Sequence, residues 1–127
     1  MKIGMMICFD WIFPELTRTL ALKGAQIIAH PSNLVMPYCQ SAMVTRCLEN
    51  RVFAITANRV GRETRGDDDF TFTGKSQVTC VNGNILSAAP MGKPCVETIG
   101  IDIHHADNKS INPYNDLLKD RREDFYS

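Results

Sequence analysis

Cys8 is the residue of this chain best placed to act as a nucleophile. The apolar run from Ile3 to Ile7 predicts a buried strand. Pro14 and Glu15 predict the first turn of a helix, because proline suits the first helical position and a carboxylate there meets the positive end of the helix dipole. The Cys8 thiol therefore lies at a sharp strand-to-helix turn, beside backbone N–H groups that can stabilise an oxyanion. The alternative is a buried structural cysteine, which is common among free cysteines.

A second candidate follows from the next strand. The helical spacing of 15–23 and the short apolar run 25–29 complete a strand, helix, strand unit, which predicts two parallel strands. Ligands of such sheets bind beyond the carboxyl ends of the strands, where Cys8 and the loop His30 to Asn33 (HPSN) would both lie. We therefore expect Asn33 to hydrogen-bond a substrate, unless it only shapes a turn.

The remaining segments continue the alternation that an α/β fold requires. The expected elements are a helix at 40–51, a buried strand at 52–57, a solvated charged loop at 61–69, a strand at 70–81, a hairpin turn at Asn82-Gly83, a return strand at 85–88 and a last strand at 96–103. The hairpin should close one edge of the sheet. Arg46 and Glu49 are three residues apart and can pair on their helix without any catalytic role.

Composition excludes several classes of function. Fourteen basic and fourteen acidic residues cancel, so neither nucleic acid nor an anionic membrane surface is an expected partner. No apolar run is long enough to span a bilayer and no leader-like segment opens the chain, which favours a cytoplasmic location. The five cysteines are widely spaced, and the adjacent His104 and His105 would point to opposite faces of a strand. We expect no disulfide, no metal and no cofactor.

The segment CFDWIFPE, from Cys8 to Glu15, resembles the nucleophile motif of the nitrilase, or carbon–nitrogen hydrolase, superfamily. Four later segments resemble the same family: HPSN at 30–33, RCLENRVFAITANRVG at 46–61, FTGKSQV at 72–78 and NPYNDLLKDRREDFY at 112–126. The resemblance covers essentially the whole chain but only the second half of the family's domain. It implies an α/β fold, namely the C-terminal half of a nitrilase-like layered αββα sandwich. Residues 1–107 would form that part of the domain, and the amphipathic tail 108–127, which has some helical character, would contact a neighbouring subunit.

The resemblance also implies a chemistry. Members of the family cleave a non-peptide C–N bond in a small amide, carbamoyl or nitrile substrate with a Glu-Lys-Cys triad. Here Cys8 would be the nucleophile and the Phe9 backbone N–H an oxyanion donor, while the implied supporting residues are Glu15, Arg46, Glu49, Asn58 and Arg59. The family's glutamate and lysine precede the cysteine, yet only seven residues precede Cys8, and Lys2 is too far along an extended strand to act on it.

The residues after the motif's aspartate bear on the substrate. Relatives that act on N-carbamoyl amino acids place an arginine there to clamp a carboxylate. This chain has Trp11 and Ile12, and an aromatic wall at Trp11 favours a neutral or apolar group at that position. The resemblance therefore leans towards an amide, ω-amide or carbamoyl-amine substrate.

Two other readings stay open. Half of a sandwich exposes an apolar face, so the chain could be a non-catalytic module that forms homo-oligomers or pairs with a separate N-terminal half. A thiol redox protein built on Cys8 is disfavoured, because no resolving cysteine is near in sequence. Without the glutamate and the lysine, the 127-residue chain alone is expected to be inactive or nearly so.

Overall fold

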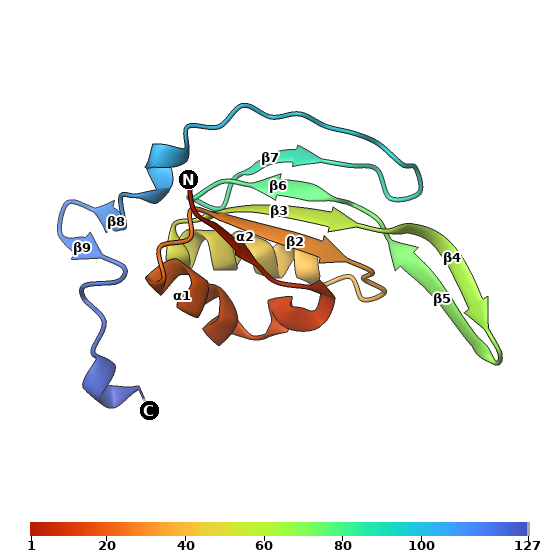
Figure 1. Ribbon diagram of the computed structural model, residues 1–127, viewed down its shortest axis with the longest axis horizontal. Helices are drawn as coiled ribbons and strands as arrows, with labels where there is room; N and C mark the ends of the chain where they lie inside the picture. Colours follow the sequence, from red (N-terminus) through yellow and green to blue (C-terminus); the bar gives the residue numbers. More distant parts are fainter. Residues whose placement is uncertain (127) are drawn as a thin grey trace.

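A mixed five-stranded sheet with two helices on one face forms the body of the molecule (Figure 1). The computed structural model describes residues 1–126. The strand order is β1-β2-β3-β6-β7. These strands are β1 (Ile3–Met5), β2 (Ile27–Ser32), β3 (Phe53–Asn58), β6 (Gln77–Thr79) and β7 (Ile85–Ala88), and the helices are α1 (Pro14–Leu22) and α2 (Cys39–Asn50). The predicted α/β class is confirmed.

The first three strands are parallel and define the edge at which a site can form. Ile3 of β1 pairs with Ile27 of β2, which pairs with Phe53 of β3, and α1 and α2 make the two crossovers. The predicted strand, helix, strand unit is thus confirmed. Strands β6 and β7 run antiparallel and close the far edge as a hairpin, as expected.

Most of the core lies between the sheet and the two helices. Ile28 and Ala54 from the sheet pack with Ala21 of α1 and Met43 of α2 in one buried cluster. Gly4 lets α1 approach β1 closely, since a Cβ there would lie 3.2 Å from the Leu20 Cβ. This packing fixes both helices on the same face of the sheet.

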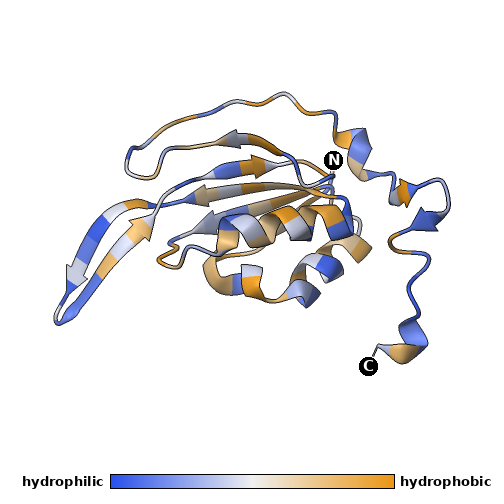
Figure 2. Cartoon of the chain, turned by 180° about the vertical axis from the view of Figure 1, so that it is seen from behind, coloured by the Kyte–Doolittle hydropathy of each residue, from blue (hydrophilic) through white to orange (hydrophobic). Residues whose placement is uncertain are grey.

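The opposite face carries an apolar row that is only partly covered. Met5, Ala29, Ile55 and Val78 are successive cross-strand partners along it, and Met5 is 64% exposed. A smaller buried cluster with Phe53 at its centre covers one end of this face. Figure 2 shows apolar residues along the strands as well as on the helices. The sheet therefore has one packed face and one largely open face.

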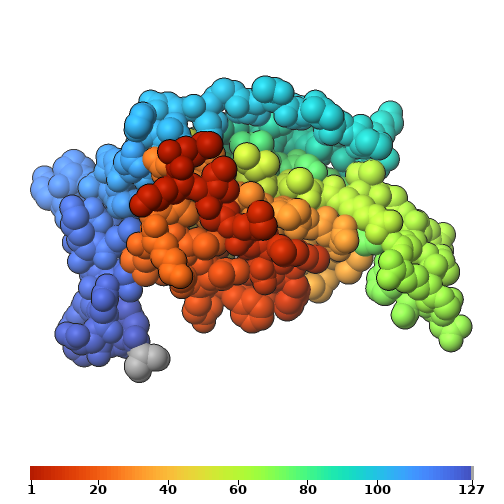
Figure 3. Space-filling model, in the orientation of Figure 1, coloured from red at the N-terminus to blue at the C-terminus, as the bar shows by residue number. Residues whose placement is uncertain are grey.

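Residues 61–69 are not the predicted solvated loop. They belong to β4 (Val60–Arg65) and β5 (Asp68–Thr73), a two-stranded hairpin that projects beyond the sheet (Figures 1 and 3). Charges pair across this hairpin, with Arg62 bonded to Asp69, and Phe72 of β5 is buried near its base. The single strand predicted at 70–81 is wrong too, because left-handed residues Gly74 and Lys75, at φ 57° and 52°, separate β5 from β6.

The strand predicted at 96–103 is also absent. This segment is extended but pairs with no strand among the described residues, and Val96 is 97% exposed. Ile103, the last residue of the predicted strand, instead begins the short helix η2 (Ile103–Ala106), which also contains His104 and His105. A strand needs a partner for its backbone groups, and residues 1–126 provide none here.

The tail leaves the body of the molecule without forming a long helix. It contains a small hairpin, β8 (Ser110–Asn112) with β9 (Asn115–Asp116), and the short helix η3 (Glu123–Phe125). The helical character predicted for 108–127 is therefore wrong for the described part, and Ser127 lies outside the described residues. Within residues 1–126, no helix has the length and apolar character that a membrane span needs.

The β6–β7 turn offers a test of the fold. Gly83 has φ 83°, and an added Cβ would lie 3.2 Å from Val44 Cγ1. We expect Gly83→Ala to lower the free energy of unfolding by about 1–2 kcal/mol, because the left-handed region is costly for an L residue. Gly92→Ala is the matched control, since nothing lies within 4 Å of its added Cβ. Equal denaturation midpoints for the two variants would contradict this view of the turn.

Candidate active site

Cys8 lies on a strained turn at the carboxyl end of β1. It opens the short helix η1 (Cys8–Ile12) with φ 47°, a left-handed conformation that non-glycine residues rarely adopt. The Asp10 carboxylate accepts a hydrogen bond of 2.7 Å from the Ile7 N–H, and the Asp10 N–H donates back to the Ile7 carbonyl at 3.0 Å. The predicted sharp turn at Cys8 is confirmed, and Asp10 holds it closed.

His30 fixes the turn from behind. Its side chain is buried, with Nε2 2.9 Å from the Cys8 carbonyl oxygen and Nδ1 3.2 Å from Thr56 Oγ1. A carbonyl can only accept, so Nε2 carries the proton and Nδ1 accepts from the Thr56 hydroxyl. Burial lowers the pKa of His30, while the bond to the Cys8 carbonyl opposes this shift. The imidazole is therefore held neutral and positions the Cys8 backbone.

This role of His30 was missed from the sequence. His30, Pro31 and Ser32 were predicted to form a loop with Asn33, whereas the structure places the first three in β2. One signal in the sequence could have revealed that His30 positions Cys8. His30 occupies a position that faces the core in β2, and β2 pairs in parallel with β1, the strand that leads to Cys8.

The structure brings Cys8 and Asn33 together, as predicted. Both line a cavity of about 190 Å³ whose other walls are Ile7, Pro31 and Ser32. Phe9 occupies the second position of η1, where a helix leaves its N–H groups without intrahelical acceptors. Among residues 1–126, no carboxylate or lysine lines this cavity. In the described part of the chain, this cavity is therefore lined by the Cys8 thiol, the Ser32 hydroxyl and the Asn33 carboxamide, and by no general base.

Trp11 does not form a wall of this cavity, so that prediction is wrong. Its side chain is 4% exposed and belongs to the core cluster between sheet and helices. It meets the Phe9 ring edge to face at 6.2 Å. The helical turn after Cys8 rotates Trp11 inward, whereas Phe9 and Ile12 stay exposed.

Asn58 organises the chain around Asn33. Its Oδ1 accepts from the Leu34 N–H at 2.8 Å, and its Nδ2 donates to the Gly74 carbonyl at 2.7 Å. The buried side chain thereby ties the segment after β2 to the base of the β4–β5 hairpin. Next to it, the Arg59 guanidinium lies 4.3 Å from the centre of the Phe72 ring.

Three residues implied to support the site lie elsewhere. The predicted pair of Arg46 and Glu49 is confirmed at 3.2 Å, but it lies in the second half of α2, which leads back to the amino end of β3. Glu15 is exposed in the first turn of α1. None of the three lines the Cys8 cavity.

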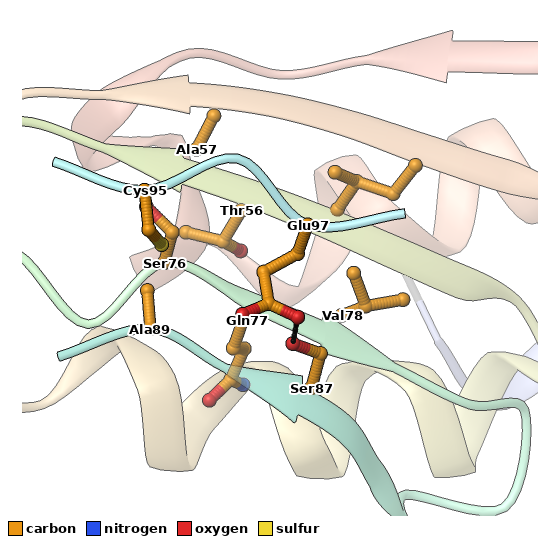
Figure 4. A pocket seen from close by; sticks show the side chains of 10 residues that line it. Thr56, Ala57, Ser76, Gln77, Val78, Ser87, Ala89, Cys95 and Glu97 are labelled. Atoms are coloured by element: carbon orange, nitrogen blue, oxygen red, sulfur yellow. Dashed lines mark hydrogen bonds between the residues drawn. The ribbon is translucent and has the colours of Figure 1, made fainter. Parts of the chain in front are cut away.

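The other cysteines differ from Cys8 in their surroundings. Burial raises the pKa of the Cys39 thiol to about 12 and also raises that of Cys47. Cys95 is exposed on the helix-free face, beside a cavity of about 180 Å³ where Ser87 donates to Glu97 at 3.1 Å (Figure 4). In the described part of the chain, no group of three His, Cys, Asp or Glu side chains could hold a metal ion.

Comparison with known proteins places this chain in a family. The model of the carbon-nitrogen hydrolase family matches residues 1–107. A nitrilase from Pyrococcus abyssi is 53% identical over 126 residues, which cover 99% of this chain and 47% of that protein. An (R)-stereoselective amidase from a Pseudomonas species is 33% identical over 124 residues, covering 95% of this chain and 43% of that protein.

A solved structure agrees. The carbon-nitrogen hydrolase from Helicobacter pylori G27 superposes with a TM-score of 0.83 at 28% identity, covering 98% of this chain and 47% of that chain. The chain belongs to the carbon-nitrogen hydrolase family, that is, to the nitrilase superfamily. It spans about half the length of the curated relatives it matches.

The buried His30 makes stability depend on pH. Its pKa in the folded state lies below the ordinary value, so between the two values the unfolded chain binds more protons. The stabilisation is complete above about pH 6.5 and is lost as pH falls through this window. We therefore expect the urea midpoint to fall from pH 7.5 to pH 5 and His30→Gln to flatten this dependence. The exposed His104→Gln is the control, and parallel profiles for His30→Gln and the unaltered chain would contradict the assignment.

Proposed function

We propose that this chain carries the nucleophile half of a carbon–nitrogen hydrolase that acts on small amide, carbamoyl or nitrile substrates. The observation that carries the proposal is the Cys8 thiol on a strained turn, in one cavity with Asn33 and beside the N–H groups that open η1. The names of the relatives, a nitrilase and an amidase, support this substrate range.

For an amide, the reaction would proceed through a thioester. The Cys8 thiolate attacks the carbonyl carbon, and the Phe9 N–H stabilises the oxyanion. The C–N bond then breaks, and ammonia or an amine leaves with a proton. Water hydrolyses the thioester to the carboxylic acid and restores the thiol. Asn33 would orient the substrate, and His30 would position the Cys8 backbone without contacting the substrate.

The general base has to come from outside these residues. No carboxylate or lysine of the described chain lines the Cys8 cavity, and Lys2 lies at the start of the strand that ends near Cys8. We propose that a glutamate and a lysine from another part of the assembly complete the site. Loss of a general base alone removes about two to four orders of magnitude of rate, so the 127-residue chain by itself would turn over slowly or not at all.

The open face of the sheet supports this proposal. The row from Met5 to Val78 is apolar, and a second layer would cover it as in a sandwich of two sheets. On this proposal, 1–107 is the C-terminal part of the domain and 108–127 contacts a neighbouring copy. Tyr114, which is 91% exposed on the tail, supplies apolar area for that contact.

The same open face supports a second candidate function. A chain without a base of its own could serve as a non-catalytic module that acts by oligomerisation or by pairing with a separate N-terminal half. Acylation chemistry separates the two candidates, because only the first requires a reactive Cys8.

The test uses an activated ester, which can acylate a thiol without help from a general base. We expect p-nitrophenyl acetate to place one acetyl group on Cys8 and to deacylate slowly, as read by intact-protein and peptide mass spectrometry. Cys8→Ala should abolish the labelling, whereas Cys95→Ala, at an exposed cysteine, should leave it unchanged. Labelling that goes mainly to Cys95 and survives Cys8→Ala would contradict the nucleophile and favour the non-catalytic module.

A further inference from the structure

Ser32 carries the hydroxyl group that lines the Cys8 cavity. It is the last residue of β2 and is 9% exposed. Successive side chains of a strand alternate between its two faces, so Ser32 points to the same side of the sheet as His30, two residues earlier. The hydroxyl therefore lies between the buried imidazole and the open cavity.

The contacts of this hydroxyl leave its proton available to the cavity. Ser32 Oγ lies 3.0 Å from His30 Nε2, the same nitrogen that lies 2.9 Å from the Cys8 carbonyl oxygen. Because Nε2 carries the proton, its N–H is shared between the Cys8 carbonyl and Ser32 Oγ, and Ser32 Oγ accepts there. For its own proton the hydroxyl has the His30 carbonyl oxygen at 3.4 Å, which is long for an O–H···O bond. The proton can therefore turn towards a better acceptor in the cavity.

The backbone and the side chain of Ser32 are both held in place. Ser32 pairs with Asn58 of β3, and its carbonyl accepts from the Arg59 N–H at 3.0 Å. The His30 imidazole that bonds to Ser32 Oγ also fixes the Cys8 carbonyl, so one side chain positions the hydroxyl relative to the turn that carries the thiol. A donor that is already in place needs no reorganisation when negative charge develops during a reaction, and this is what makes oxyanion stabilisation effective.

We propose that the Ser32 hydroxyl donates a hydrogen bond to the oxyanion that forms when Cys8 attacks a carbonyl carbon. In this step an S–C bond forms and the C=O π electrons move to the oxygen. The Ser32 O–H and the Phe9 N–H stabilise that charge without transferring a proton. When the intermediate collapses, the C=O bond forms again and the leaving group departs with the electrons of its bond to carbon. This inference rests on the proposed function, because it assigns the nucleophile to Cys8.

The test compares two reactions of the Cys8 thiol. Acetylation by p-nitrophenyl acetate passes through an oxyanion, whereas alkylation by iodoacetamide is a displacement at a saturated carbon and forms none. We expect Ser32→Ala to slow the acetylation of Cys8 at least about tenfold, because loss of one oxyanion donor costs that much or more. The alkylation rate should stay unchanged. Both rates are read by mass spectrometry of the peptide that contains Cys8.

Two further variants separate a hydrogen-bond donor from a structural support. Ser32→Thr keeps a hydroxyl group and should restore most of the acetylation rate. Ser87→Ala removes a hydroxyl from the helix-free face, where it lies in the cavity beside Cys95, and should leave both rates unchanged. If Ser32 only supported His30, Ser32→Ala would loosen the Cys8 turn and change acetylation and alkylation together.

Three results would overturn the inference: an unchanged acetylation rate in Ser32→Ala, a parallel fall in acetylation and alkylation, or no recovery in Ser32→Thr. If Cys8 of the unaltered chain takes up no acetyl group, the proposed function fails and this inference fails with it. Acetylation of the unaltered chain with an equal rate in Ser32→Ala contradicts the inference alone, so the two failures are distinguishable.

Discussion

The hydrogen bond from the buried His30 imidazole to the Cys8 carbonyl is the interaction on which the site depends. Cys8 has a left-handed backbone, and such strain persists only where the surroundings fix it. His30 fixes it from β2, Asp10 fixes it within η1, and Thr56 of β3 in turn orients His30. The Cys8 carbonyl, just after β1, is therefore held by His30 of β2, which is itself held by Thr56 of β3. The parallel order of β1, β2 and β3 is what makes this convergence possible.

The same edge of the sheet organises the surroundings of the thiol. Asn58 at the end of β3 ties Leu34 to the base of the β4–β5 hairpin, so the hairpin and Asn33 are held in one framework. The hairpin then brings its charges beyond the sheet, next to the Cys8 cavity. The opposite face of the sheet keeps its apolar row, from Met5 to Val78, largely open.

Local signals in the sequence predicted local structure well. The Cys8 turn and the Asn82-Gly83 hairpin follow from residue types that specify backbone geometry, and both are confirmed. The parallel pairing of β1 with β2 was predicted, but several other properties that depend on distant partners were not. The role of His30 depends on a neighbouring strand, the direction of Trp11 depends on the rotation of η1, and the 96–103 segment lacks a partner strand. Strand β4 has too little apolar alternation to be recognised, whereas Phe70 and Phe72 of β5 fall within the strand predicted at 70–81.

The central claim is that Cys8 is held in a strained conformation that serves its chemistry, and the relative stability of Cys8→Gly and Cys8→Ala tests it most directly. In a relaxed backbone, glycine is less stable than alanine by about 0.5–1 kcal/mol. At φ 47° the order should reverse, because the left-handed region costs an L residue about 1–2 kcal/mol. We expect Cys8→Gly to have the higher free energy of unfolding in urea. A more stable Cys8→Ala would show that the turn is relaxed and would contradict the account.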